Sequence, residues 1–185
     1  MDISFVIVTG GQRKEKLSLL IKSIQFQIDD PEIIVVGNTS QSPSVICVRE
    51  IESAKLGLLG DLRNKGCSLA SHSNIVILDD DMLLHRDWYN NFISYGKDFD
   101  ILTSQVRSPD GTRFWDHCCY QSPDRGHCLL GPEEYNDYLY MSGGQAWIMK
   151  KKVFDRVQWD GVFYNMKNML SISDYKLGKH NEDTD

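Results

Sequence analysis

The chain has 185 residues, of which 41% are hydrophobic and 25% are charged, and its formal net charge at pH 7 is −6. This length suits one compact domain with its own core. The acidic balance argues against a nucleic-acid-binding protein, and no apolar run approaches the roughly 18–20 residues of a membrane span. Lys150-Lys151-Lys152 is too short to predict binding to anionic lipid, and peripheral membrane contact stays open.

The N-terminus and the cysteines indicate a cytoplasmic protein. Met1-Asp2-Ile3 leads directly into an apolar run, without a basic or secretory segment. The five cysteines are an odd number and lack the spacing of a disulfide framework. We therefore expect a reducing environment, whereas the oligomeric state is not predicted.

Apolar strand patterns and amphipathic helix patterns alternate through about the first hundred residues. The expected strands span 3–9, 32–36, 44–48 and 75–78, and the expected helices span 14–27, 60–71 and 87–95. Asp61 is available as the N-cap of the helix at 60–71. Such alternation predicts an α/β fold, with helices on both faces of a mainly parallel, Rossmann-like sheet.

The pattern changes after Ile101. Ser108-Pro109-Asp110-Gly111 predicts a turn. Residues 111–140 mix aromatic residues, Cys, Pro and Gly without a clear period, so we expect irregular structure with short antiparallel strands there. A strand at 145–149 and a short helix at 151–157 are expected to follow.

Three aspartates, Asp79-Asp80-Asp81, follow the apolar run at 75–78 directly. In open parallel sheets, ligands bind beyond the carboxyl ends of the strands. Adjacent carboxylates repel each other unless a positive group joins them, and Mg²⁺ or Mn²⁺ prefers such oxygen ligands. The triplet alone is equally compatible with a solvated acidic loop, so a metal site is one of two interpretations.

Three further segments carry candidate chemistry. Arg63 could pair with a phosphate or a carboxylate, and Asn64 with a ligand or the backbone, although an ordinary surface ion pair fits as well. Gly143-Gly144 would let backbone N–H groups approach a ligand, or would simply form a turn. Glu182-Asp183, with His180 nearby, could take a proton from an acceptor hydroxyl, or could be a charged tail.

The order of these segments resembles the GT-A glycosyltransferases, especially the large family-two group. Val8-Thr9 matches the end of a first strand near the nucleotide, and Arg63-Asn64-Lys65-Gly66 matches a segment before the metal strand. Asp79-Asp80-Asp81 matches the D-x-D motif. Ser142-Gly143-Gly144 matches an acceptor-side segment, and Glu182-Asp183 matches the catalytic Glu-Asp motif. The resemblance covers nearly the whole chain, and five motifs in order make it fairly specific.

The resemblance implies an inverting, hexosyltransferase-like enzyme that depends on Mn²⁺ or Mg²⁺. It would move a sugar from a nucleoside-diphosphate sugar to a hydroxyl of a glycan or another acceptor. Residues 1–100 would form the nucleotide-sugar-binding half of a single domain, and residues 101–185 the acceptor-side half. Charge stabilisation of the leaving diphosphate would carry much of the rate.

The same resemblance implies roles for individual residues. Asp81 would bind the metal, with Asp79 and Asp80 on the metal or the ribose. Arg63 would stabilise the departing diphosphate, and Asp183, beside Glu182, would act as the base. The remaining candidates are His180 for the metal, Thr9, Asn38 and Asn64 for the nucleotide, and Gly143, Gly144, Trp115 and Asp116 for the substrate.

Two departures from the family pattern keep other functions open. Gly37-Asn38 stands where the family usually has an acidic residue for the base, and the chain ends at Asp185, where the family continues. A C-terminally truncated chain is therefore one expectation. One alternative is a sugar-nucleotide nucleotidyltransferase, because residues 9–14 weakly resemble the basic Gly-rich loop of that class. The other is a degenerate domain that binds nucleotide sugar or glycan without turnover.

Overall fold

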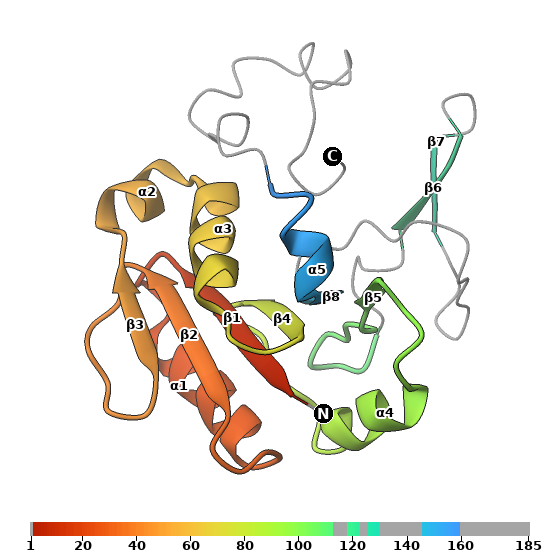
Figure 1. The fold of residues 1–185 in the computed structure, drawn as a ribbon, viewed down its shortest axis with the longest axis horizontal. Coiled ribbons are helices and arrows are strands. Elements are labelled where there is room, and N and C mark those ends of the chain that lie inside the picture. Colours follow the sequence, from red (N-terminus) through yellow and green to blue (C-terminus); the bar gives the residue numbers. More distant parts are fainter. Residues whose placement is uncertain (1, 113–117, 123–125, 130–145, 160–185) are drawn as a thin grey trace.

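The computed structural model describes residues 2–112 and 146–159, together with the backbone of 118–122 and 126–129 (Figure 1). Seven of the predicted site residues lie outside these described residues. They are Trp115, Asp116, Gly143, Gly144, His180, Glu182 and Asp183.

The described part contains strands and helices in the alternation that the sequence predicts. The strands are β1 (Ile3–Thr9), β2 (Glu32–Gly37), β3 (Ile46–Arg49), β4 (Asn74–Asp79), β5 (Ile101–Thr103), β6 (Cys118–Ser122), β7 (Gly126–Leu129) and β8 (Ala146–Lys150). The helices are α1 (Lys14–Gln25), α2 (Ile51–Leu56), α3 (Leu59–Leu69), α4 (Trp88–Tyr95) and α5 (Lys151–Phe154).

Six strands form one sheet in the order β3-β2-β1-β4-β8-β5. The first four of these are parallel, whereas β8 pairs antiparallel with both β4 and β5. The carboxyl ends of β1, β2 and β4 therefore meet at one edge of the sheet. The hairpin of β6 and β7 is antiparallel, and it falls where short antiparallel strands are expected.

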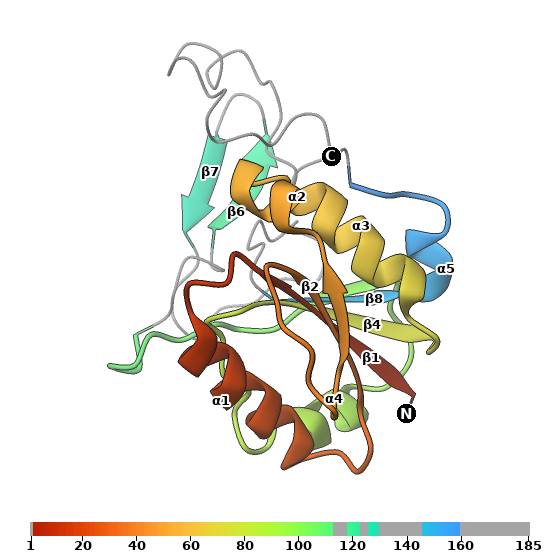
Figure 2. The ribbon, with the colours of Figure 1, turned by 90° about the vertical axis from the view of Figure 1, so that its left-hand side faces the viewer.

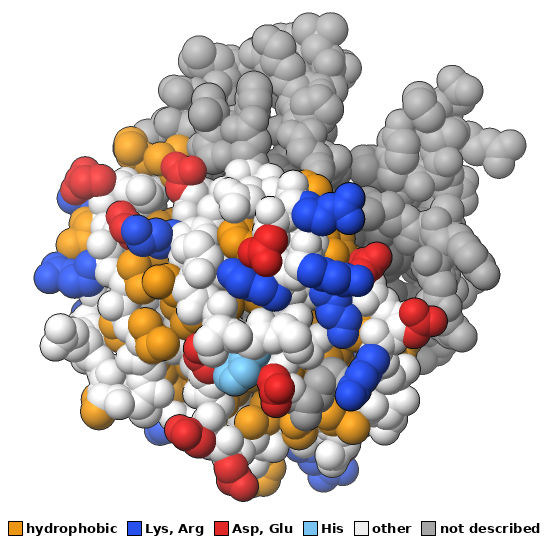
Figure 3. Space-filling model, in the orientation of Figure 1, with side chains coloured by type: hydrophobic (Ala, Val, Ile, Leu, Met, Phe, Trp, Pro, Cys, Tyr) orange, Lys and Arg blue, Asp and Glu red, His pale blue; other side chains and the backbone are white. Residues whose placement is uncertain are grey.

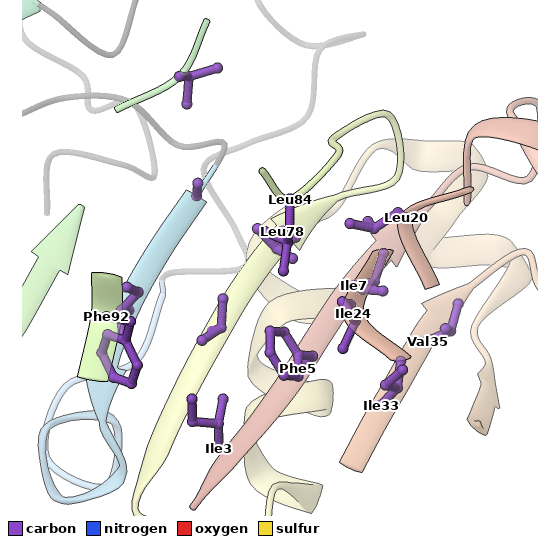
Figure 4. Packing of buried hydrophobic residues seen from close by; sticks show 14 residues of the cluster. Ile3, Phe5, Ile7, Leu20, Ile24, Ile33, Val35, Leu78, Leu84 and Phe92 are labelled. Carbon is purple, nitrogen blue, oxygen red and sulfur yellow. The ribbon is translucent and has the colours of Figure 1, made fainter. Parts of the chain in front are cut away.

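Helices cover both faces of the large sheet, as Figure 2 shows, with α1 and α4 on one side and α2, α3 and α5 on the other. All seven residues of β1 are buried, and its side chains alternate between the two cores. Ile3, Phe5 and Ile7 pack with α1 and α4 (Figure 4), and Val6 and Val8 pack with α3 and α5. Burial on both faces explains why the strand is a continuous apolar run.

Gly66 brings α3 close to the sheet. A Cβ on this residue would lie 2.3 Å from Val6 Cγ1 and 3.1 Å from Val36 Cγ2, which is inside van der Waals contact. This close approach packs α3 directly against β1 and β2. The glycine of the Arg63-Asn64-Lys65-Gly66 segment thus has a packing function.

The structure corrects several details of the sequence interpretation. Helix α3 begins at Leu59 after an N-cap at Leu58, so Asp61 lies in the first turn and is not the cap. Helix α2 and strand β5 are not predicted at all, because six and three residues are too short to show a hydrophobic period. Most predicted element ends differ from the observed ones by one or two residues, and helix α5 ends three residues earlier than expected.

Candidate functional site

The ends of β1 and β4 are joined by a buried hydrogen-bond network. The Thr9 hydroxyl donates to Asp80 Oδ2 at 2.6 Å and accepts from the Gly11 N–H at 3.0 Å. Thr9 is 3% exposed and Asp80 6% exposed, so both polar groups are nearly removed from water. Of the three aspartates, Asp80 therefore has the most direct structural role, because it fixes the loop that follows β1.

Asn38, directly after β2, holds the same loop from the other side. Its side-chain amide donates to the Gly10 carbonyl at 3.3 Å. Gly11 has φ +84°, and a Cβ there would lie 2.6 Å from the Asn38 carbonyl oxygen. Only glycine fits this conformation and this approach without strain. Thr9, Asn38 and Asp80, predicted as separate site residues, thus come together at one edge of the sheet.

A depression of about 370 Å³ opens beside Asn38, at the ends of β2 and β3. Its described lining carries two basic side chains together with amide and hydroxyl groups. The lining residues are Lys14, Asn38, Thr39, Ser40, Gln41 and Arg49. This arrangement offers hydrogen-bond donors and acceptors beside Asn38, which holds the same loop as Thr9 and Asp80.

Asp81 is held by basic residues from the start of α1. Arg13 Nη1 lies 2.7 Å from Asp81 Oδ2 and 3.4 Å from Asp80 Oδ1, and Lys16 Nζ lies 4.0 Å from Asp81 Oδ2. The side chains of Arg13 and Lys16 are 52% and 61% exposed. The sequence interpretation missed both as partners of the triplet, although the basic character of residues 9–14 gave a signal for Arg13.

Asp79 pairs with an arginine of a different kind. Arg63 Nη2 lies 3.8 Å from Asp79 Oδ1, and the Arg63 side chain is only 4% exposed. Its guanidinium carbon lies 6.0 Å from the centre of the Trp159 ring. Arg63 therefore contacts the triplet from inside the protein, and Trp159 is a residue of this neighbourhood that no sequence motif indicated.

Asn64 fixes Trp159 in this position. Its amide nitrogen donates to the Trp159 carbonyl at 2.6 Å, and its carbonyl oxygen accepts from the Trp159 N–H at 3.0 Å. The Trp159 ring also contacts Trp147 and Phe154. The predicted backbone-bridging alternative for Asn64 is thus observed, across 95 residues of sequence. Asn64 holds the segment after α5 against α3.

Cys67 lies one turn further along α3 and is buried. Burial raises the pKa of its thiol to about 12, although Lys151 and Arg63 nearby act in the opposite direction. A thiol with such a pKa stays protonated at neutral pH and is a poor nucleophile. Cys67 therefore contributes packing to this neighbourhood and not reactivity.

Basic side chains gather around α5 on the face shown in Figure 3. The three consecutive lysines each have partners within the protein. Lys150 donates to Asn74 at 2.8 Å, Lys151 donates to the Cys67 carbonyl at 2.8 Å, and Lys152 pairs with Asp100 at 2.9 Å. Among the described residues, no helix is long and apolar enough to cross a membrane.

Comparison with solved structures confirms the predicted GT-A-like, Rossmann-like fold. TarS 1–349 from S. aureus superposes with a TM-score of 0.60 at 13% identity, over 90% of this chain and 52% of that chain. The mannosyltransferase PcManGT from Pyrobaculum calidifontis, in complex with GDP-Man and Mn²⁺, gives 0.53 at 14% identity, over 86% and 48%. HddC from Yersinia pseudotuberculosis gives 0.53 at 17% identity, over 85% and 80%.

The present chain thus spans about half the length of the TarS chain that it matches. At these low identities the similarity establishes the fold alone. No protein-family model and no curated protein matches the sequence. A functional proposal for this chain therefore rests on the fold and on the polar residues that cluster at the strand ends.

Proposed function

We propose that this protein binds a nucleoside-diphosphate sugar and transfers its sugar to an acceptor hydroxyl. The observation that carries the proposal is the meeting of Thr9, Asn38, Asp79 and Asp81 at the carboxyl edge of the sheet, beside the depression at Asn38. Ligands of open α/β sheets bind at this edge. The shared fold adds support, because TarS was solved with UDP and with UDP-GlcNAc, and PcManGT with GDP-Man.

The donor set at this edge fits a divalent cation. Asp79 and Asp81 are 33% and 31% exposed, so both carboxylates are within reach of a ligand. The described residues contain no group of three or more His, Cys, Asp or Glu that could enclose a metal. Mg²⁺ and Mn²⁺ do not need such a group, because one or two carboxylates together with substrate phosphates hold them. The cation would neutralise charge on the departing diphosphate.

The protein residues around this place have distinct tasks in the proposal. Arg63 fixes the orientation of Asp79 from the interior, and Thr9 with Asp80 fixes the loop on the opposite side. Asn38 lines the depression next to the diphosphate position. The proposal keeps the metal, base and acceptor roles that the family resemblance implies for His180, Glu182, Asp183, Gly143, Gly144, Trp115 and Asp116. It also includes inversion at the anomeric carbon and a cytoplasmic location.

Calorimetry with Mn²⁺ and UDP, GDP and their sugars tests the proposal. We expect at least one nucleotide to bind, and Asp81→Asn to weaken its binding at least tenfold, because a metal ligand is lost. Asp98→Asn is the matched control, since it removes one exposed carboxylate from the loop after α4. Unchanged nucleotide affinity in Asp81→Asn would refute the metal-dependent donor site.

A transfer assay tests the second half of the proposal. Asp183→Asn should keep nucleotide affinity and lose sugar transfer, because it removes the proposed base. A fully active variant would remove Asp183 from that role. Donor binding in the wild-type protein without transfer or donor hydrolysis would favour the degenerate binding domain.

The nucleotidyltransferase alternative rests on one observation, the basic loop from Gly10 to Lys14. Arg13 in this loop contacts the aspartates, and Lys14 lines the depression. The basic side chains of Arg13 and Lys14 are therefore near the position proposed for the phosphates. Release of pyrophosphate from a nucleoside triphosphate and a sugar phosphate would favour this alternative.

A further inference from the structure

The charge of the aspartate triplet is balanced by the protein itself. Arg63 pairs with Asp79, Arg13 pairs with Asp80 and Asp81, and Lys16 lies at the outer limit of an ion pair with Asp81. Three formal negative charges thus face three formal positive charges. A divalent cation that enters this place must compete with a cation that is already there.

The competition falls on Arg13. Its guanidinium and an incoming cation compete for the same carboxylate, because Arg13 Nη1 already lies 2.7 Å from Asp81 Oδ2. Lys16, at 4.0 Å, is too distant to hold that oxygen by a hydrogen bond. Arg63 is enclosed by the protein and contacts a different carboxylate. Arg13 is therefore the group that a metal on Asp81 would displace.

Arg13 is also free to move to a new partner. Half of its side chain is exposed, and its contact with the buried Asp80 is long, at 3.4 Å, so a change of rotamer gives up mainly the 2.7 Å pair with the partly exposed Asp81. Exposed ion pairs of this kind are weak, typically below 1 kcal/mol. The planar fork of a guanidinium matches a diphosphate at least as well as a carboxylate. The diphosphate of the proposed donor would lie beside the same carboxylates.

We propose that Arg13 is a switching residue of the donor site, one that neutralises Asp81 before ligands bind and contacts the donor diphosphate once a divalent cation occupies Asp81. This inference rests on the proposed function and adds a residue to it. The metal alone binds against competition from Arg13. The metal together with a diphosphate binds without that cost, because the displaced guanidinium gains a partner. Metal and nucleotide therefore bind cooperatively, and the coupling depends on Arg13.

Direct binding measurements on Arg13→Gln test this switch without an activity assay. We expect the variant to bind Mn²⁺ alone about threefold more tightly than the wild type, as followed by the electron paramagnetic resonance signal of free Mn²⁺. The gain is small because the displaced ion pair is exposed. In the presence of saturating Mn²⁺, the variant should bind UDP or GDP about tenfold more weakly, because a charge-assisted contact to the diphosphate is lost.

Two further variants separate charge from position. Arg86→Gln is the matched control, since Arg86 is an exposed arginine in the loop after β4 and pairs with Asp87. It should leave both affinities within twofold of the wild type. Arg13→Lys keeps the charge and loses the planar fork, so it should restore weak Mn²⁺ binding without restoring full nucleotide affinity.

The outcomes distinguish this inference from the proposed function. Tighter Mn²⁺ binding and weaker nucleotide binding in Arg13→Gln, with Arg86→Gln unchanged, support the switch. Equal Mn²⁺ affinity in Arg13→Gln and wild type overturns the switch, and so does equal nucleotide affinity. In both cases, Mn²⁺-dependent nucleotide binding by the wild type would still support the proposed donor site. A wild-type protein that binds neither Mn²⁺ nor nucleotide overturns both proposals.

Discussion

The two arginines that pair with the aspartate triplet have the same chemistry and opposite surroundings. Arg63 comes from a helix, is 4% exposed and lies against Trp159. Arg13 comes from the loop before α1 and is 52% exposed. The carboxylates Asp79 and Asp81 are about equally exposed, so the two pairs differ in the arginine: a buried arginine is fixed by what surrounds it, whereas an exposed one exchanges readily with water and ions. Arg63 therefore belongs to the scaffold beneath the aspartates, and Arg13 belongs to the exposed surface around them.

The largest expected effect is that of Arg63→Met, which tests the scaffold role. The substitution keeps the approximate volume and removes the charge and hydrogen-bond donors from a buried position. We expect the free energy of unfolding to fall by roughly 2–3 kcal/mol, in the range for broken buried polar networks. Urea unfolding followed by tryptophan fluorescence measures this loss.

Arg13→Met is the matched control for that experiment, because the same atoms are removed from an exposed position. It should change the free energy of unfolding by less than about 0.5 kcal/mol. Equal losses in the two variants would contradict the division between scaffold and surface. A loss confined to Arg13→Met would reverse it.

Thr9→Val should have the next largest effect and extends the comparison to an uncharged group. The valine keeps the β-branched shape and removes the hydroxyl that joins Asp80 to the Gly11 N–H. Because Asp80 is buried, we expect a loss of roughly 1–3 kcal/mol in the free energy of unfolding. Thr39→Val is the control, since its hydroxyl makes only long contacts, at 3.4 Å with the Ser40 carbonyl and at 3.9 Å with Cys47 Sγ. Thermal unfolding of the two variants under one condition decides whether burial sets the size of the effect.

Some features of the fold and of this site could be predicted from the sequence, and the different surroundings of the two arginines could not. The buried strands were predictable, because β1, β2 and β4 are continuous apolar runs, and their ends located Thr9, Asn38 and Asp79. The contact between Asn64 and Trp159 was not, because it joins residues 95 positions apart and neither segment signals the other. Nor does any pattern show that Arg63 is buried and Arg13 exposed. Local periodicity reports which face of an element is apolar, whereas the partner of a charged side chain depends on tertiary packing.

The smallest expected effect concerns Glu32, which lies at the opposite edge of the sheet and is only partly buried, with 16% of its side chain exposed. Its Oε2 accepts hydrogen bonds from the Ser4 hydroxyl and, at 2.9 Å, from the Ser71 N–H, and His72 Nδ1 lies 3.5 Å away. Burial alone would raise the pKa of the Glu32 carboxyl, but these hydrogen bonds and His72 lower it on balance below 4.5. Because the folded-state pKa is the lower one, the ionised carboxylate stabilises the fold above the unfolded-state pKa.

That stabilisation disappears as the pH falls from about 4.5 through the folded-state pKa, since both states then bind the proton. We expect Glu32→Gln to cost roughly 0.5–1 kcal/mol at pH 6, and the difference from the wild type to shrink as the pH approaches 3. Glu52→Gln, at an 80% exposed side chain on α2, should show little difference at either pH. Urea unfolding at pH 6, 4 and 3 measures the three proteins. A difference between wild type and Glu32→Gln that stays constant over this range would mean that Glu32 acts by packing alone, and that the hydrogen bonds to its carboxylate make no pH-sensitive contribution to the free energy of unfolding.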